Sequence, residues 1–327
     1  MRHPWPVFLI PLIALFACSG LNPQSKYDRE PATDFLFDRP SMFNCSERTP
    51  GQFPKSENNG RFHSFIEIGN QAPYSRTRFE QEALSSSEVP NVTITADASN
   101  DVSVVGSDRK DLLMSYCARG DGNNEAEALG HMKQVSMTRQ GTLISLNRLA
   151  RENPPYATSS FLLDAPANEG IVVHGSFAPV EVRGMSGPVR VATSHARAQV
   201  FNTTGLVDVD AFVIDLAGSK GNITLTASAE INVKITEAKF DGTFSASAQR
   251  AVRVLLPRGF ATPFVAYVNR PDDFVCRADL CSKMKQEQTL GLFVFKYPGD
   301  GSGPAERVNF RSEEATVVID NVAAGNK

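Results

Sequence analysis

Short runs in which apolar and polar residues alternate dominate the chain from residue 170 to residue 256. Alternation with a period of two is typical of a β-strand that buries one of its two sides. The first runs begin about nine residues apart, and a run this short cannot bury its apolar side alone. Stacked runs share one core, so the pattern predicts a β-solenoid. The runs are Val180–Val182, Val189–Val191, Gln199–Phe201, Val207–Val209, Val213–Leu216, Ile223–Leu225, Ile231–Val233, Thr243–Ser245 and Val252–Val254.

A β-sandwich made of tight hairpins is the alternative architecture. Two-residue hairpin turns favour Asn-Gly or Asp-Gly, and the repeat region holds only one such pair cleanly between runs, Asp241-Gly242. The pattern therefore favours the solenoid. In either case the alternation directs apolar side chains inward and polar ones outward. The residues predicted to point outward are Glu181, Arg190, Asp208, Asp210, Thr224, Thr226 and Arg253.

A smaller β-rich part with one helix is predicted before the repeat. Alternating or apolar stretches indicate strands at Val92–Ala96, Val102–Val105, Leu112–Tyr116, Val135–Met137 and Leu143–Leu146. Residues 124–135 change to a helical period, with Ala128, Leu129 and Met132 on one face and Asn123 or Asn124 as the N-cap. We therefore expect an all-β fold: a β-solenoid, or single-stranded β-helix-like repeat, preceded by a small β-rich part that contains one short helix.

The N-terminus has the pattern of an export signal. Arg2 precedes an uncharged apolar stretch, Val7 to Ala17, which is too short to cross a bilayer as a helix. The stretch ends in Leu15-Phe16-Ala17-Cys18, which resembles a bacterial lipobox, where the cysteine receives a lipid. We expect a signal peptide over residues 1–17 and lipid attachment at Cys18, with conventional cleavage near Ala17 as the alternative. The same resemblance implies that Ser19, directly after this cysteine, favours the outer membrane as the destination of the lipoprotein.

Residues 18–60 have the composition of a tether between the membrane and a folded body. They are rich in Pro, Asn, Ser and charged residues and keep no apolar period. Phe35, Phe37, Phe43 and Phe53 interrupt the polar pattern and are candidates for docking part of the tether onto the body. The expected organisation is a signal at 1–17, a tether at 18–60, a β-rich domain at 61–322 and a tail at 323–327.

Four cysteines follow Cys18, and an even number in an exported chain permits two disulfides. Cys276 and Cys281 are separated by four residues, so we expect them to close a short loop. Cys45 would then pair with Cys117 and hold the tether to the first strands. Four cysteines allow three connectivities, so both pairings are expectations. Metal binding is the rival interpretation, although no histidine or second cysteine pair lies nearby in the sequence.

Four stretches share a similar short pattern: Asn100–Gly106, Ser186–Val191, Thr204–Val209 and Lys220–Leu225. They resemble the Gly-x-Val-x-Val rungs of the bacterial "putative adhesin" domain family, whose function is unknown. The similarity covers about residues 89–322, and the stretch from Phe260 to Pro304 departs from the pattern. The resemblance implies a β-solenoid in the cell envelope and carries no catalytic residues over to this chain.

Composition narrows the classes of function. The chain has 327 residues, of which 41% are apolar and 21% charged, so it can form a substantial core. Its net charge of -3 shows no basic excess of the kind that nucleic-acid binding requires. The expected partners are therefore a membrane, through the N-terminal lipid, and an envelope glycan or a surface protein, with no nucleic acid.

Candidate chemistry is sparse. His174 and His195 lie on neighbouring repeats, but two histidines without a third ligand are weak support for a metal. Asp208, Asp210 and Asp215 could form a carboxylate patch of the kind that glycoside hydrolysis uses. Outward acids on a strand are usually solvated, and the repeat contains no Trp or Tyr for sugar stacking. We expect a binding or scaffolding surface with no catalysis, metal or cofactor; the alternatives are a polysaccharide-modifying enzyme and an envelope sensor.

Overall fold

A computed structural model describes residues 43, 45, 74–85, 91–97, 100–149, 156–301, 307–314 and 316–322. The expected signal peptide, Cys18, most of the tether and the tail lie outside the described residues. No helix in the described ranges is long and apolar enough to span a membrane.

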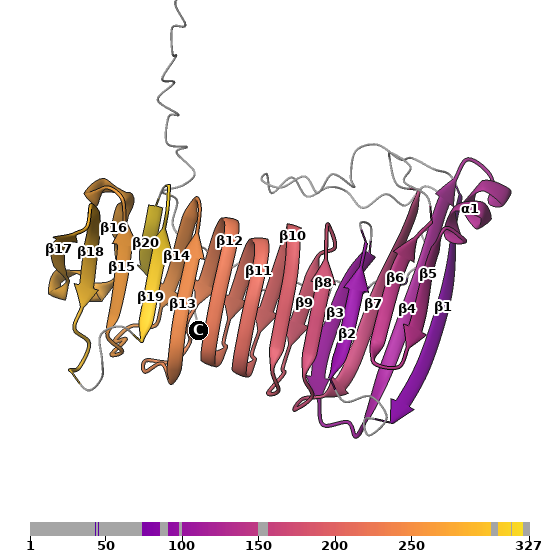
Figure 1. The fold of residues 1–327 in the computed structure, drawn as a ribbon, viewed down its shortest axis with the longest axis horizontal. Helices are drawn as coiled ribbons and strands as arrows, with labels where there is room; N and C mark the ends of the chain where they lie inside the picture. The colour runs from indigo at the N-terminus through magenta and orange to yellow at the C-terminus, as the bar shows by residue number, and fades with distance from the viewer. Residues whose placement is uncertain are drawn as a thin grey trace, which may run out of the picture.

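The described chain is built almost entirely of strands, with one α-helix, α1 (Glu125–Met132), and two short 3₁₀ turns (Figure 1). The predicted all-β class with a single short helix is therefore confirmed. The strands are β1 (Tyr74–Ser85), β2 (Val92–Ala96), β3 (Asn100–Ser107), β4 (Asp111–Gly122), β5 (Val135–Gln140), β6 (Leu143–Arg148), β7 (Ala157–Pro166), β8 (Ile171–Gly175), β9 (Val180–Arg183), β10 (Val189–Phe201), β11 (Thr204–Ala217), β12 (Lys220–Lys234), β13 (Gly242–Ala248), β14 (Ala251–Leu256), β15 (Phe264–Val268), β16 (Phe274–Cys276), β17 (Lys285–Thr289), β18 (Leu292–Tyr297), β19 (Val308–Ser312) and β20 (Thr316–Asn321).

The strands wind into two faces that enclose one core. The front face, toward the viewer in Figure 1, has the order β5–β6–β2–β8–β10–β11–β12–β13–β19–β15–β18–β17. The back face has the order β1–β4–β7–β3–β9–β10–β11–β12–β14–β20–β16. Strands β10, β11 and β12 bend and belong to both faces, and successive central rungs pair in parallel.

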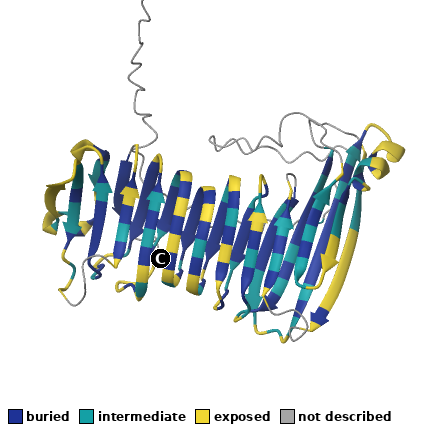
Figure 2. Ribbon diagram, viewed as in Figure 1, coloured by how far each residue is buried: buried dark blue, intermediate teal, exposed yellow. Residues whose placement is uncertain are grey.

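The core follows from the alternation that the sequence shows. On the front face, inward residues of neighbouring strands are in register and buried, as in the row Val191, Val209, Leu225, Ala246 and Phe310. The back face contributes the row Ala198, Ile214, Ile231, Val252 and Val317, each 0% exposed. Full burial of one Val or Ile side chain stabilises a fold by about 1.5–3 kcal/mol, so the stacked rows supply the main stabilising contribution. Figure 2 shows exposed residues concentrated on α1, β1 and β17 at the two ends.

The rungs are not stacked in the order of the sequence at either end. The rung made by β2 and β3 lies between the β6–β7 and β8–β9 rungs. The rung made by β19 and β20 lies between the β13–β14 and β15–β16 rungs. Beside it, β17 and β18 form an antiparallel hairpin. The stacking of neighbouring repeats therefore holds for the centre of the molecule and fails at its ends.

Helix α1 packs over the core side of β4. Its N-cap is Asn124, whose side-chain oxygen accepts the Glu127 backbone N–H at 2.9 Å, in agreement with one of the two predicted caps. Ala128 and Met132 are buried. A Cβ at Gly120 would lie 2.2 Å from the Ala128 carbonyl oxygen, so only glycine allows this close approach.

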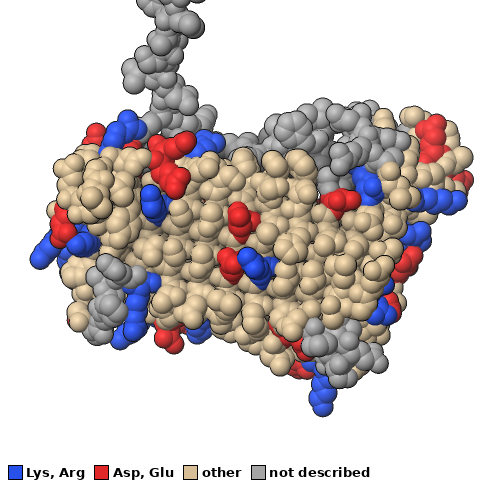
Figure 3. All heavy atoms as spheres, in the orientation of Figure 1, with Lys and Arg blue, Asp and Glu red and all other residues tan. Residues whose placement is uncertain are grey.

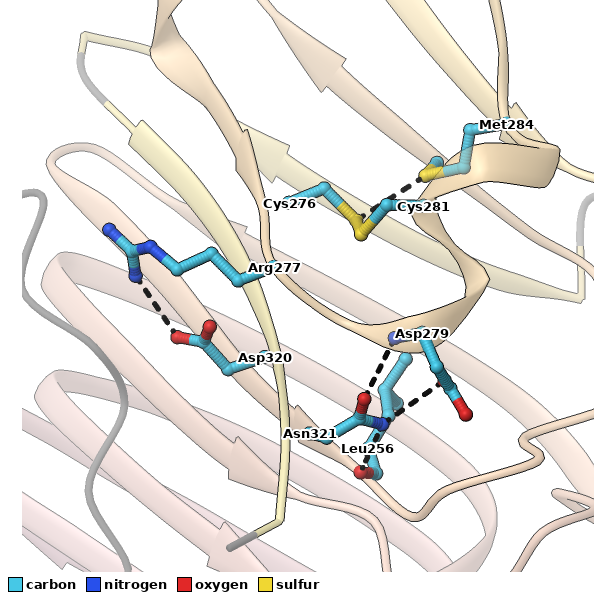
Figure 4. The surroundings of a disulfide bond; sticks show 8 residues. All are labelled: Leu256, Cys276, Arg277, Asp279, Cys281, Met284, Asp320 and Asn321. Carbon is cyan, nitrogen blue, oxygen red and sulfur yellow. Dashed lines mark hydrogen bonds and ion pairs between the residues drawn. A yellow bond between two sulfur atoms is a disulfide. The ribbon is translucent and has the colours of Figure 1, made fainter.

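Both expected disulfides are present: Cys45 is bonded to Cys117, and Cys276 to Cys281. The Cys276–Cys281 loop is held against β20 by polar contacts (Figure 4). The Asp279 backbone N–H donates to the Asn321 side-chain oxygen at 2.8 Å, and Arg277 forms an ion pair with Asp320 at 3.2 Å. The short disulfide therefore shapes a loop that clamps the inserted strand β20.

Candidate ligand-binding site on the front face

The front face is hollowed where its strands turn toward the back face. The hollow has a volume of about 460 Å³ and is lined mainly by small and polar side chains. Those that can hydrogen-bond a ligand include Thr95, Asp97, Asn147, His174, Ser194 and Asp210. Figure 3 shows that the middle of this face carries few charged side chains.

Strand register explains how distant residues meet in the hollow. Thr95 of β2 pairs with His174 of β8, which pairs with Ala192 of β10, which pairs with Asp210 of β11. Neighbouring strands lie about 4.8 Å apart, so His174 and Asp210 stand roughly 10 Å apart across Ala192. The methyl group of Ala192 leaves room between them, and the hollow is the result.

An exposed aromatic pair borders the hollow. The ring of Phe177 stacks on His195, with centroids 4.6 Å apart and planes 17° apart. Ser194 donates a hydrogen bond to the Ser176 carbonyl at 3.2 Å and lies 2.8 Å from Nδ1 of His195. Phe177 keeps 55% of its surface exposed, and Phe212 on a neighbouring rung keeps 38%. An apolar platform thus lies beside hydroxyl groups.

The predicted carboxylate patch of three aspartates does not form. Asp208 and Asp210 share the front face, where Asp208 pairs with the exposed Arg190 at 3.4 Å. Asp215 lies on the back face and is 0% exposed. The two histidines also have different surroundings: His174 lines the hollow, whereas His195 stacks on Phe177. Sequence reasoning missed Asn147, near the end of β6, and also Asp97 and Phe177, which follow β2 and β8 outside the alternating runs.

Two of the seven residues predicted to be solvated on the outer surface are buried. Glu181 is 1% and Arg253 is 8% exposed, and both lie on the back face. They belong to one row in register, which we call the back-face row: Glu181, Gln199, Asp215, Asn232 and Arg253. The alternation correctly directs these side chains away from the core, but their burial requires a cover that alternation cannot reveal.

Ion pairs and hydrogen bonds compensate the charges of this row. Arg197 pairs with Asp215, Arg183 pairs with Glu181, and Arg253 pairs with Glu230 at 2.8 Å. The carboxylate of Asp215 also accepts hydrogen bonds from Gln199 at 3.3 Å and from Asn232 at 2.9 Å. Buried charges are tolerated only with such partners, so Asp215 is the centre of the network.

Asp101 on β3 offers a test of the electrostatics of the back face. Burial of its carboxyl group raises the pKa of Asp101 from 3.8 to about 6. The folded state therefore holds this proton more tightly than the unfolded state, and the fold loses stability as pH rises from about 4 to about 6. Asp101→Asn should raise the free energy of unfolding at pH 7.5 by about 1–3 kcal/mol and change it little at pH 3.5. Urea unfolding at the two pH values measures this; an equal effect at both would contradict it.

No group of three or more His, Cys, Asp or Glu is placed to hold a metal ion in the part of the chain that the structure describes. The hollow brings together one histidine and two carboxylates that belong to separate strands or turns, and its remaining polar groups are hydroxyls and amides. Such groups suit hydrogen bonding to an uncharged polar ligand.

Comparison with known proteins finds structural likeness only. The chain matches no protein-family model and no curated protein sequence. Its structure is similar to a "putative cell adhesion protein" from Clostridium sporogenes, with 9% identity, 75% of this chain and 99% of that chain covered, and a TM-score of 0.32. It is also similar to a "putative adhesin" from Bacteroides fragilis, with 11% identity, 76% and 97% coverage, and a TM-score of 0.26. These values assign nothing to this chain beyond the likeness itself.

Proposed function

We propose that this protein is a lipid-anchored protein of the bacterial cell envelope that binds a glycan in the front-face hollow and catalyses no reaction. The observation that carries the proposal is the hollow itself, in which hydroxyl, amide, imidazole and carboxylate groups border the exposed Phe177–His195 stack. A sugar ring presents hydroxyl groups at its edge and C–H groups on its faces. The polar lining suits the former and the aromatic ring suits the latter.

The two carboxylates of the hollow favour binding over hydrolysis. Glycoside hydrolysis needs one acid whose pKa is raised by burial or by a close partner. Asp97 and Asp210 are both exposed to water. Water reaches both carboxylates, so they can accept hydrogen bonds from sugar hydroxyls.

Binding to immobilised polysaccharide from the bacterium's own envelope tests this function. Phe177→Ala and Asp210→Asn should each weaken binding about tenfold, because they remove the apolar platform and a charged acceptor. Asp208→Asn is the matched control, since Asp208 lies two residues away on β11 and pairs with Arg190 outside the hollow. The proposal would be contradicted if the unchanged protein bound none of the envelope polysaccharides. It would also be contradicted if Asp210→Asn and Asp208→Asn weakened binding equally.

The same preparation tests the enzymatic alternative. Polysaccharide incubated with the protein should keep its chain length, as measured by size-exclusion chromatography and reducing-end assay. Cleavage that is lost in Asp210→Asn would replace the binding function by a hydrolytic one.

The anchor is tested separately at Cys18. One acyl chain binds a membrane only marginally, whereas two or three anchor it stably. Cys18→Ala should therefore move the protein from the membrane fraction to the soluble fraction. Intact mass spectrometry of the mature protein checks the assignment, and a first residue other than a lipid-bearing Cys18 would refute it.

A further inference from the structure

The outer side of the back face is buried where the outer side of the front face is open. Asp215 is 0%, Glu181 1% and Asn232 3% exposed, although all three side chains point away from the core. Equivalent outward residues of the front face, such as Arg190 and Thr224, are exposed. Every partner named above for the back-face row also lies on this face, so these contacts alone do not shield the row from water.

An apolar cluster accompanies the back-face row. Phe201, Ala217 and Leu255 are 3%, 9% and 2% exposed and form a buried group separate from the main core, with Val322 packed against it. The guanidinium of Arg183 lies 4.4 Å from the centre of the Phe201 ring. The back face therefore presents a continuous surface of paired polar groups beside an apolar strip.

Three residues on this face that are at least nine-tenths buried have a side-chain atom without a hydrogen-bond partner. The atoms are Oδ1 of Asn232, Oγ of Ser103 and Oγ1 of Thr316 on β20. The unpaired Asn232 atom is an acceptor, and the Ser103 hydroxyl can accept as well. Leaving a buried polar atom unpaired costs about 1–3 kcal/mol, so the face is suited to a covering chain with free backbone N–H groups.

The Cys45–Cys117 disulfide brings the N-terminal part of the chain to this face. Cys117 pairs in register with Ser160 of β7, while its neighbour Tyr116 points into the core. Cys117 therefore points outward, on the side of the back-face row. Residue 45 is fixed at the β4 end, and the residues that precede it can extend along the face.

We propose that residues 33–44 of this chain lie across the back face from β4 to β14, with Phe35 and Phe37 on the Phe201–Ala217–Leu255 cluster. From β4 to β14 there are seven strand spacings, or about 34 Å. Ten extended residues, from Phe35 to Cys45, span about 33 Å. The aromatic residues thus reach the strip when the segment is fully extended.

Chain direction favours this segment over the one after Cys45. The named ion pairs join three carboxylates of the face to three arginines, so an apolar occupant matches it. Residues 33–44 hold Phe35, Leu36 and Phe37 with only three charges. Residues 46–73 must return to Tyr74, which pairs with Gly122 of β4, so they would have to cross the face twice.

Thiol labelling in the full mature chain tests the docking. In a Cys18→Ala background, Ala217→Cys should react with a maleimide at least tenfold more slowly than Ala192→Cys in the open hollow. Phe35→Ser with Phe37→Ser should raise the Ala217→Cys rate about tenfold and leave the Ala192→Cys rate unchanged, which also shows that the fold is intact. The matched control, Phe53→Ser with Phe62→Ser, should change neither rate.

Two results would overturn the proposal. Fast labelling of Ala217→Cys in the otherwise unchanged chain would show that the face is open. Slow labelling that survives the Phe35 and Phe37 substitutions would show that another occupant covers it, and the Phe53 and Phe62 variant then identifies or excludes the later segment. Neither result depends on glycan binding, so the docking and the proposed function fail independently.

Discussion

Replacing Asp215 with Ala should lower the free energy of unfolding by about 3–5 kcal/mol. The carboxylate is fully buried and is the shared partner of Arg197, Gln199 and Asn232. Its removal leaves a guanidinium and two amides without their acceptor in a place that is shielded from water, and the unpaired buried charge is the most destabilising of these. Urea unfolding followed by circular dichroism measures the loss.

Asp208→Asn is the control for this experiment. Asp208 is also an aspartate of β11, but its ion-pair partner, Arg190, is exposed. An exposed ion pair contributes about 0–1 kcal/mol, so the control should unfold almost as the unchanged protein does. Equal losses at positions 208 and 215 would show that Asp215 is hydrated in solution and that the back face is not covered.

Removal of the Cys45–Cys117 disulfide should have a comparable effect. Cys45→Ser with Cys117→Ser frees a loop with a sequence separation of 72, for which loop-closure entropy predicts a loss of roughly 4 kcal/mol. The Cys276–Cys281 bond closes a separation of only 5, so its removal should cost about 2 kcal/mol. Thermal and urea unfolding of the two double variants measure the difference. A larger loss from the short loop would contradict the entropic account.

The strands of the repeat were predictable because their burial is local. Each Val-x-Val run directs its apolar side chains to one side, and every predicted run of the repeat falls within a strand. The order of the rungs was not predictable, because runs of the same pattern can stack on one another equally well. Only tertiary contacts stack the β2–β3 rung next to the β6–β7 rung, on the side nearer the centre of the molecule. The same holds for the β19–β20 rung, which stacks on the central side of the β15–β16 rung.

The candidate site was predictable in part for the same reason. His174 and Asp210 stand out as polar residues on regular strands, and both line the hollow. Asn147 joins them only because β6 stacks beside β2, which no local pattern indicates. Phe177 appears in the sequence as one apolar residue in a turn, and its stacking on His195 depends on the meeting of two rungs.

The position of the β19–β20 rung determines the order in which the C-terminal rungs can assemble during synthesis. Ribosomes add about 5–20 residues per second, so Thr316 is made several seconds after the strands β15 and β16 that finally flank its rung. Until then β14 has no neighbour on its outer side, and β15 and β16 cannot occupy their final places. A ribosome that stalls before Val308 therefore leaves the edge of the β13–β14 rung unpaired, and unfinished chains can pair with one another along this edge.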